Sequence, residues 1–140
     1  MSSPDFNVLV VDDEPDMCWI LGHMIERMNV HCIRALDGAS ALLLAQSNRL
    51  GLALLDAKLT DMDGLELARQ IRTLCPSVPI LLVSGYFYRD DPAVQSALEE
   101  GLIRGFIEKP FSHVEIGRAL QSVLAAEQAA PDAGGPADAR

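Results

Sequence analysis

The chain has 140 residues and 49% of them are hydrophobic, so it is long enough for one domain with a core and too apolar to be wholly disordered. Its formal net charge of −9 argues against nucleic-acid binding by this domain, because the phosphate backbone requires a cationic face. The apolar runs are short and the N-terminus has no basic or apolar leader, so we expect neither a membrane span nor a secretory signal.

Short apolar runs alternate with helical patterns along the chain, which is typical of βαβ units and a parallel sheet. We predict, in chain order, strand 7–11, helix 15–28, strand 30–35, helix 38–47, strand 52–56, helix 64–74, strand 79–84, helix 92–100, strand 104–108 and helix 113–127. We further expect a flexible N-terminus over 1–5, one domain over 6–127, and a disordered tail over 128–140 that is rich in Ala, Pro and Gly.

Several local signals support the helices. An apolar stripe along the first helix is predicted from Met17, Ile20, Leu21, Met24, Ile25 and Met28, while Trp19 falls off that stripe. Pro15 suits a first helical turn, and Gly101 suits the end of the fourth helix. Asp63 with Glu66, and Ser112 with Glu115, have the spacing of capping boxes. The three cysteines include no CxxC pair, and we interpret them as buried thiols in a reducing cytoplasm.

Polar side chains follow four of the five predicted strands. Asp12 and Asp13 follow the first strand, Asp56 and Ser84 end the third and fourth, and Lys109 follows the fifth. The carboxyl ends of parallel strands meet at one edge of the sheet, where open α/β folds place their chemistry. One edge is therefore expected to gather three carboxylates, a hydroxyl and an ammonium.

Each of these residues also has an ordinary structural interpretation. Asp12 and Asp13 could cap a helix, and Asp56 could cap the loop after its strand. A lone Ser84 is a strand-end hydroxyl, and a lone Lys109 is most often a solvated surface lysine. Together they suit a different role, because paired carboxylates repel unless a cation lies between them, and hard oxygen ligands favour Mg²⁺.

Asp56 beside a metal and a lysine is an acceptable phosphoryl acceptor, because both cations neutralise the charge that repels an incoming phosphate. Ser84 could then donate a hydrogen bond to a phosphoryl oxygen. Pro110 restricts the backbone of Lys109, and an X-Pro bond there can be cis and aim the lysine side chain.

At this point the chain resembles the receiver domain of two-component response regulators, over about Phe6 to Ala126. The resemblance rests on four motifs in order: Val10-Val11-Asp12-Asp13-Glu14, Asp56-x-x-Leu59-x-x-Met62-Asp63-Gly64, Val83-Ser84-Gly85-Tyr86 and Phe106-x-x-Lys109-Pro110-Phe111. It implies a flavodoxin-like, doubly wound α/β fold, with a five-stranded parallel sheet of order 2-1-3-4-5 and helices on both faces.

The resemblance also implies a set of roles. Asp56 would accept a phosphoryl group from a histidine kinase or phosphotransfer protein. Asp13, Asp56 and the backbone carbonyl of Lys58 would ligate Mg²⁺, with Asp12 acting largely through water. Ser84 and Lys109 would hold phosphoryl oxygens. Ser84 and Phe106 would form a switch that changes the face of the fourth helix, fifth strand and fifth helix for a downstream protein, or for a second copy of the chain.

Three departures from the family pattern bear on that switch. Phe106 stands where Tyr is frequent, so the switch would work by bulk alone. Ser84 replaces the commoner Thr and keeps the donor. Thr60 stands where Pro is frequent, so we expect a looser loop after Asp56, and Lys58 is expected near the mouth of the site.

Other functions remain open from the residues. A phosphatase with an aspartyl intermediate typically has a second Asp two residues after the nucleophile, and here that position is Lys58. A binding module that is never phosphorylated would not need Asp13, Asp56 and Lys109. A phosphate-relaying module and a receiver fragment of a larger DNA-binding regulator also fit, although 140 residues read as a complete chain disfavour the fragment. We expect a stand-alone phosphorylatable signalling switch, not an enzyme.

Overall fold

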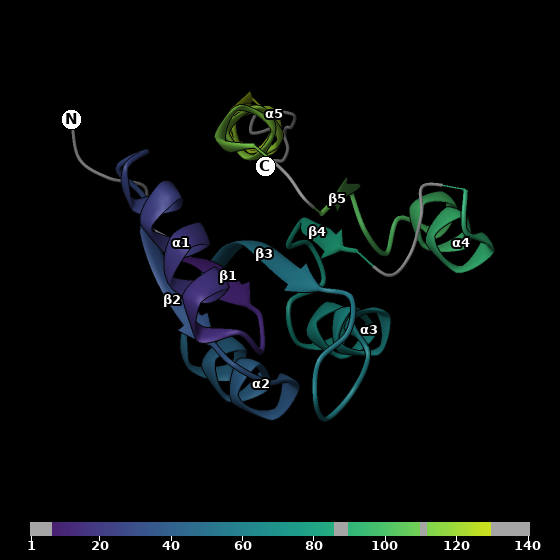
Figure 1. The fold of residues 1–140 in the computed structure, drawn as a ribbon. Coiled ribbons are helices and arrows are strands. Elements are labelled where there is room, and N and C mark those ends of the chain that lie inside the picture. Colours follow the sequence, from purple (N-terminus) through teal and green to yellow (C-terminus); the bar gives the residue numbers. More distant parts are fainter. Residues whose placement is uncertain (1–6, 86–89, 110–111, 130–140) are drawn as a thin grey trace.

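The computed structural model describes residues 7–85, 90–109 and 112–129. Five strands form one parallel sheet in the order β2-β1-β3-β4-β5, as predicted. The strands are β1 (Asn7–Val11), β2 (His31–Ala35), β3 (Leu50–Asp56), β4 (Ile80–Ser84) and β5 (Gly105–Glu108). The helices are α1 (Pro15–Glu26), α2 (Gly38–Ser47), α3 (Gly64–Leu74), α4 (Pro92–Glu100) and α5 (His113–Ala129). Figure 1 shows these elements in space.

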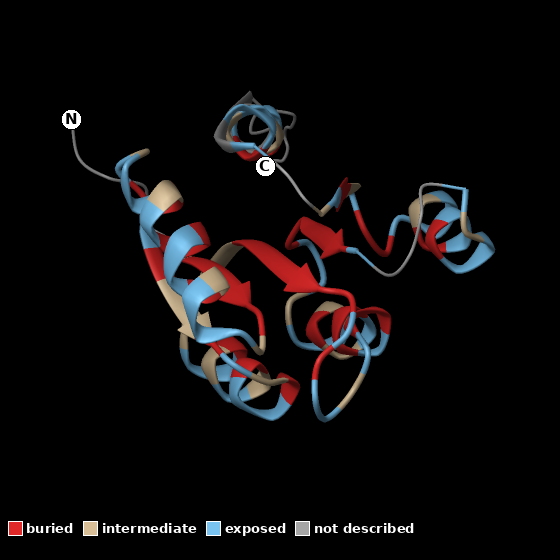
Figure 2. Cartoon of the chain, in the orientation of Figure 1, coloured by how far each residue is buried: buried red, intermediate tan, exposed pale blue. Residues whose placement is uncertain are grey.

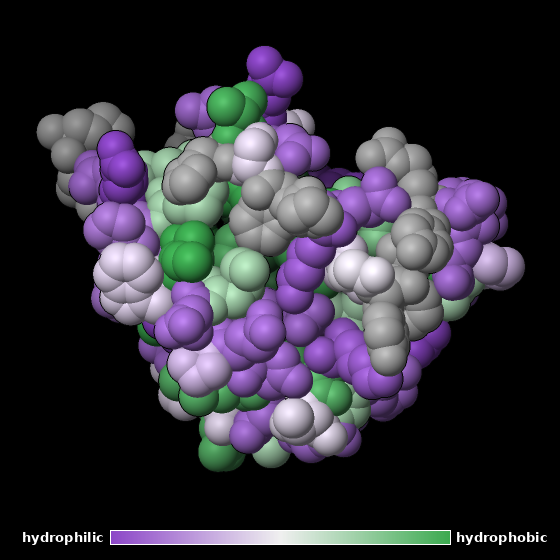
Figure 3. All heavy atoms as spheres, viewed as in Figure 1, coloured by the Kyte–Doolittle hydropathy of each residue, from purple (hydrophilic) through white to green (hydrophobic). Residues whose placement is uncertain are grey.

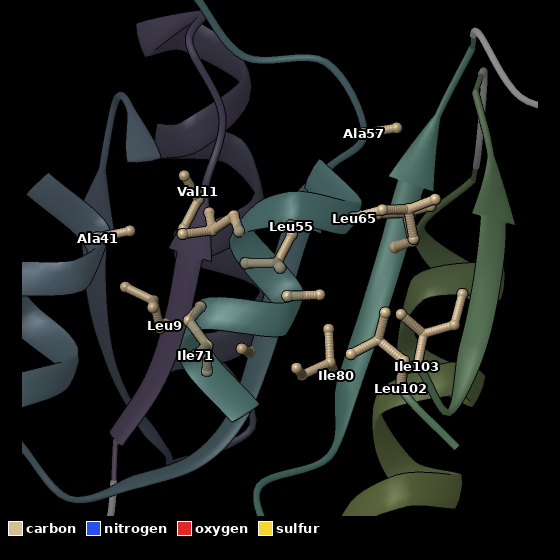
Figure 4. Close-up of a cluster of buried hydrophobic side chains, with 14 of the residues drawn as sticks. Leu9, Val11, Ala41, Leu55, Ala57, Leu65, Ile71, Ile80, Leu102 and Ile103 are labelled. Carbon is tan, nitrogen blue, oxygen red and sulfur yellow. The ribbon is translucent and has the colours of Figure 1, made fainter. Parts of the chain in front are cut away.

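Two apolar layers sandwich the sheet, because successive side chains of a strand point to opposite faces. Leu9 and Val11 of β1 join a cluster with α2, α3 and α4, part of which Figure 4 shows. Val8 and Val10 join a second cluster with α1 and α5. The central strands β1, β3 and β4 are buried almost throughout, the edge strands β2 and β5 are partly exposed, and the helices expose their outer faces (Figure 2). Two-sided burial explains why the three central strands appear in the sequence as continuous apolar runs rather than as alternating ones.

Most boundaries agree with the sequence, and the differences have local causes. β3 begins two residues earlier than predicted, because Leu50 pairs with Asn7 across an irregularity before Val8. α1 ends two residues earlier, where Asn29 adopts a left-handed backbone with φ of 65°. α5 extends to Ala129, two residues into the expected tail. Residues 1–6 and 130–140 lie outside the described residues, as does Pro110.

The apolar stripe predicted for the first helix is confirmed except at Ile20, since Leu21 and Ile25 are buried and the three methionines pack against the same cluster. The residues that α1 buries are Cys18, Leu21, Gly22 and Ile25. Ile20 is 39% exposed, whereas Met17 and Met24 are only partly buried. Trp19 is exposed, as expected, and its ring stacks on His23 at a centroid distance of 5.0 Å. Cys18 is buried like Cys32, while Cys75 is only half-buried.

The helices are capped largely as predicted, by side chains at the N-terminal ends of α3 and α5 and by a glycine at the C-terminal end of α4. Ser112 and Glu115 form a complete capping box, with Ser112 N–H donating to Glu115 at 2.8 Å and Glu115 N–H donating to Ser112 at 3.1 Å. Asp63 accepts from Glu66 N–H at 2.8 Å. Gly101 ends α4 with φ of 78°, a conformation that favours glycine. Among the described residues, no helix combines the length and the apolar character needed to cross a membrane.

Candidate phosphoryl and metal site

The parallel sheet brings the predicted strand-end residues to one edge. Asp12 and Asp13 follow β1, Asp56 and Ser84 are the last residues of β3 and β4, and Lys109 follows β5. The order β2-β1-β3-β4-β5 puts β3 between β1 and β4, so Asp56 lies at the centre of the group. The change in connection direction between β1 and β3 is the position at which doubly wound sheets bind ligands.

Three carboxylates converge at this edge. One carboxylate oxygen from each of Asp12, Asp13 and Asp56 lies within 4.8 Å of the other two. Asp12 is 1% exposed and Asp56 is 8% exposed, so both are held away from bulk water. Asp12 is fixed in place by the backbone N–H of Glu14, which donates to its Oδ1 at 2.9 Å. This arrangement supplies hard oxygen ligands within the span of one small cation.

Lys109 is the cation that the structure places beside them. Its Nζ lies 3.4 Å from Asp12 Oδ2 and 3.5 Å from Asp56 Oδ1. Its backbone N–H donates to the carbonyl oxygen of Ser84 at 2.9 Å, which aligns the ends of β4 and β5. One ammonium among three carboxylates leaves two negative charges uncompensated, and a divalent cation would balance them. The donor set therefore fits Mg²⁺.

The pKa shifts at the site follow from burial and this unequal charge. Burial raises the pKa of Asp56, and repulsion from Asp12 adds to the rise, against attraction from Lys109 and a hydrogen bond from the Lys58 backbone. Burial likewise raises the pKa of Asp12. Burial alone would lower the pKa of Lys109, but attraction from Asp12 and Asp56 outweighs it and the pKa is raised. Lys109 is therefore held as a cation.

An open cleft lies over Asp56. Asp56, Ser84 and Lys109 line it together with Asp13, Glu14, Lys58, Leu59, Thr60 and Gly85. Ser84 is buried and stands beside Asp56 because Val83 pairs with Asp56 in the sheet. Lys58 is exposed at this cleft, at the mouth position that the sequence predicts. The arrangement can admit a phosphoryl group to a carboxylate that is flanked by an ammonium and a hydroxyl.

Phe106 is not among the residues that line the cleft. It pairs with Leu82 in the sheet and is half-buried against the cluster of α2, α3 and α4. It is therefore three residues from Lys109 along β5 but packs on a helical layer, as a residue that responds to the site at a distance would. Its role as a switch stays a prediction.

Two residues of the site were missed from the sequence. Glu14 lines the cleft and donates its N–H to Asp12. Asp61 joins the loop after Asp56 to α2, by hydrogen bonds to Gly38 N–H at 2.9 Å and Ala39 N–H at 3.0 Å. The Asp-Asp-Glu run could have indicated Glu14, but Asp61 has no local signal because its partners lie 22 and 23 residues away.

Comparisons with known proteins place the chain in one family. A family model described as "Response regulator receiver domain" matches residues 8–121. The chain is 34% identical to the alkaline phosphatase synthesis transcriptional regulatory protein PhoP of Bacillus subtilis, over 89% of the chain and 51% of that protein. It is 35% identical to the cyclic di-GMP phosphodiesterase response regulator RpfG of Xanthomonas campestris, over 87% of the chain and 32% of that protein.

The fold also matches solved structures. A CheY-like response regulator receiver domain protein from Methanospirillum hungatei superposes with a TM-score of 0.80, covering 89% of this chain and 98% of that one, at 23% identity. That likeness confirms the flavodoxin-like fold. The chain spans about half of the first curated relative and about a third of the second, so the shared region in both is the part that contains the carboxylate edge.

Proposed function

This chain belongs to the receiver-domain family of two-component response regulators, and we propose that it is a phosphorylation-dependent signalling switch. In this proposal Asp56 accepts a phosphoryl group from a histidine kinase or phosphotransfer protein in the presence of Mg²⁺. The observation that carries the proposal is the convergence of three carboxylates, with Lys109 Nζ 3.5 Å from the proposed acceptor.

The chemistry is the transfer of a phosphoryl group from a donor histidine to the acceptor Asp56. A carboxylate oxygen of Asp56 attacks the phosphorus, the bond to the donor nitrogen breaks, and the electron pair leaves with the donor imidazole. Lys109 and Ser84 hold the phosphoryl oxygens. Asp13, Asp56 and the backbone carbonyl of Lys58 would hold Mg²⁺, with Asp12 acting largely through water. Mg²⁺ would supply charge neutralisation to the carboxylates and to the transferred group.

The surface beside the cleft supports a protein as the phosphodonor. α1 begins at Pro15, directly after the cleft residue Glu14, and exposes Trp19 and Ile20 on its outer side. In Figure 3, apolar surface on the viewed face lies over α1 and toward α5, beside the hydrophilic centre. A donor protein could bury that apolar surface while it places a phosphohistidine over Asp56.

The output of the switch is proposed to be the face of α4, β5 and α5. The relatives' names give different outputs, transcriptional regulation for one and a cyclic di-GMP phosphodiesterase for the other. What carries over is therefore the receiver chemistry and a protein contact, not one output. The net charge of −9 argues against nucleic acid as a direct ligand of this domain. We place the switch in the cytoplasm, where Cys18, Cys32 and Cys75, all free, stay reduced.

The direct test is phosphorylation by acetyl phosphate with Mg²⁺, followed by intact-mass measurement. The wild type should gain one phosphoryl group, and Asp56→Asn should gain none. Lys109→Ala should keep metal binding, because the carboxylate ligands remain. It should lose much of the structural response to phosphorylation, because a contact to the phosphoryl group is removed. Asp37→Asn is the matched control, since Asp37 is a carboxylate that caps α2 and lies outside the cleft. A label that persists in Asp56→Asn, or a wild type without label, contradicts the proposal.

A further inference from the structure

The loop between Asp56 and α3 is folded back on itself. Lys58 and Asp63 pair across it as an antiparallel bridge. Leu59 N–H donates to the Met62 carbonyl at 3.2 Å, and Gly64 N–H donates to the Ala57 carbonyl at 2.6 Å. These bonds shape the loop, but all of them join residues within 57–64. At the start of the loop, Ala57 N–H also donates to the Val83 carbonyl at 3.0 Å and holds that end to β4. None of these bonds attaches the far part of the loop, around Asp61, to another element.

Asp61 supplies an attachment to another element. Its Oδ1 accepts from Gly38 N–H at 2.9 Å and its Oδ2 accepts from Ala39 N–H at 3.0 Å. Both donors are in the first turn of α2, whose N–H groups have no partner inside the helix. The positive end of the helix favours the ionised carboxylate, and these two hydrogen bonds lower the pKa of Asp61. Each oxygen of the Asp61 carboxylate therefore accepts a hydrogen bond from α2.

The same helix end holds a second carboxylate with a local role. Asp37, the N-cap residue of α2, accepts from Ser40 N–H at 2.8 Å. Asp37 and Asp61 both satisfy N–H groups of one helical turn, but only Asp61 belongs to the loop after Asp56. Substitution of Asp37 would therefore affect only the stability of the helix end, whereas substitution of Asp61 would affect both that stability and the position of the loop.

Close packing reinforces the Asp61 contact. A Cβ atom at Gly38 would lie 2.7 Å from the Met62 side chain, so the loop approaches α2 closely only because position 38 is glycine. Thr60 stands beside Asp61, where the family often has a proline that would restrict the loop backbone. The attachment to α2 can supply from outside the loop the restriction that proline supplies from within. The looser loop expected from Thr60 stays a prediction about motion.

We propose that Asp61 is a positioning residue of the phosphoryl site. By holding loop 57–63 against α2, it sets where the Lys58 backbone lies relative to Asp56, and thereby how tightly the site binds Mg²⁺. The inference rests on the proposed function, because it takes the Asp12, Asp13 and Asp56 cluster as the Mg²⁺ site. Lys58 lies between Asp61 and the site. Its N–H donates a hydrogen bond to Asp56, and its bridge partner Asp63 lies two residues after Asp61.

The test is a Mg²⁺ titration followed by amide NMR shifts of the residues around Asp12, Asp13 and Asp56. Asp61→Ala should raise the half-saturating Mg²⁺ concentration by about 10-fold, the low end of the effect of removing groups that orient metal ligands. Asp61→Asn keeps one acceptor oxygen and should show a smaller rise. Thr60→Pro combined with Asp61→Ala should recover part of the affinity, because proline again restricts the loop.

Asp37→Ala is the matched control. It removes a cap from the same helix turn and should lower the urea midpoint of unfolding. It should nevertheless leave the half-saturating Mg²⁺ concentration within about twofold of wild type, a change of under 0.5 kcal/mol. Unfolding by urea checks that the Asp61 variants are folded and similarly destabilised. Equal titrations for Asp61→Ala and the wild type, or an equal loss in Asp37→Ala, overturn the inference. A wild type without Mg²⁺-dependent shifts at the cluster overturns the metal site itself, before any variant is compared.

Discussion

Asp12 and Asp56 are buried carboxylates that share one cation, Lys109, and burial raises the pKa of both above the ordinary aspartate value of 3.8. The folded protein therefore binds more protons than the unfolded chain between pH 3.8 and the raised values. The free energy of unfolding falls as pH rises through that window, and it stays lower above it. The two carboxylates thus lower the free energy of unfolding at neutral pH, whereas the raised pKa of Lys109 contributes in the opposite sense.

Asp56→Asn should consequently stabilise the metal-free protein. We expect its free energy of unfolding at pH 7 to exceed that of the wild type by about 1–2 kcal/mol, because one uncompensated buried charge is removed. Urea unfolding between pH 4 and pH 8 should also show a weaker decline with rising pH in the variant.

Mg²⁺ provides the control for this effect. Saturating Mg²⁺ should stabilise the wild type, because the ion binds only the folded site, and should stabilise Asp56→Asn much less. A variant that is less stable than the metal-free wild type across the whole pH range would show that Lys109 already compensates the charge of Asp56.

At the scale of elements, the side chain of Arg72 links α3 to the segment before β4 and to the turn between α4 and β5. It lies in α3 and donates to the carbonyl oxygens of Pro76 at 3.0 Å and of Val78, in the segment before β4. It also donates to Leu102 at 2.8 Å and Gly101 at 3.4 Å, in the turn between α4 and β5. The C-terminal end of α4 is thereby held to α3, so a movement of α4 would pivot at this end.

Arg72→Ala should lower the free energy of unfolding by about 2–3 kcal/mol, because the partly buried carbonyls of Val78 and Leu102 lose a charged donor. Hydrogen exchange should increase over residues 97–103. Arg69→Ala is the control on the same helix, where an exposed pair 4.0 Å from Glu66 should contribute under about 0.5 kcal/mol. Equal effects of the two substitutions in urea unfolding would remove Arg72 from this role.

At the scale of the whole molecule, β5 connects the site to the proposed output face. Ser84 is the last residue of β4, Lys109 follows β5, and the Lys109 N–H donates to the Ser84 carbonyl. Phe106, on β5, packs against the layer that contains α4. A shift of Ser84 toward a phosphoryl group would therefore be transmitted to β5 and to the packing of Phe106. Because Phe106 has no hydroxyl, the two states would differ only in packing and lie close in free energy.

Phosphorylation should alter hydrogen exchange across residues 90–118 as well as in the loops around Asp56. Phe106→Ala should keep the mass increase from acetyl phosphate but lose the remote change, because the packing that couples β5 to α4 is removed. Phe106→Tyr should shift the balance of the two states measurably. Changes confined to the loops around Asp56 in the wild type would instead indicate a phosphate-relaying module.

The sequence alone determined the order of elements, the parallel sheet and the edge that gathers the polar side chains. These features have local causes, since strands buried on both faces are continuous apolar runs and a polar residue directly after such a run must lie at the strand's carboxyl end. Asp12, Asp13, Asp56, Ser84 and Lys109 could be assigned to one edge for this reason, before any distance was known. The capping box of Ser112 and Glu115 is equally local, with a spacing of three residues.

Tertiary structure alone decided which residues anchor that edge and which way the helices face. Asp61 binds α2 across 23 residues and Arg72 binds Leu102 across 30, and no pattern within either segment indicates its partner. The apolar stripe of α1 was predicted correctly except at Ile20, which is as hydrophobic as the buried residues and yet is 39% exposed. Hydrophobicity states only that a side chain gains from burial, whereas the packing of α1 on β1 and β2 selects the ones that obtain it.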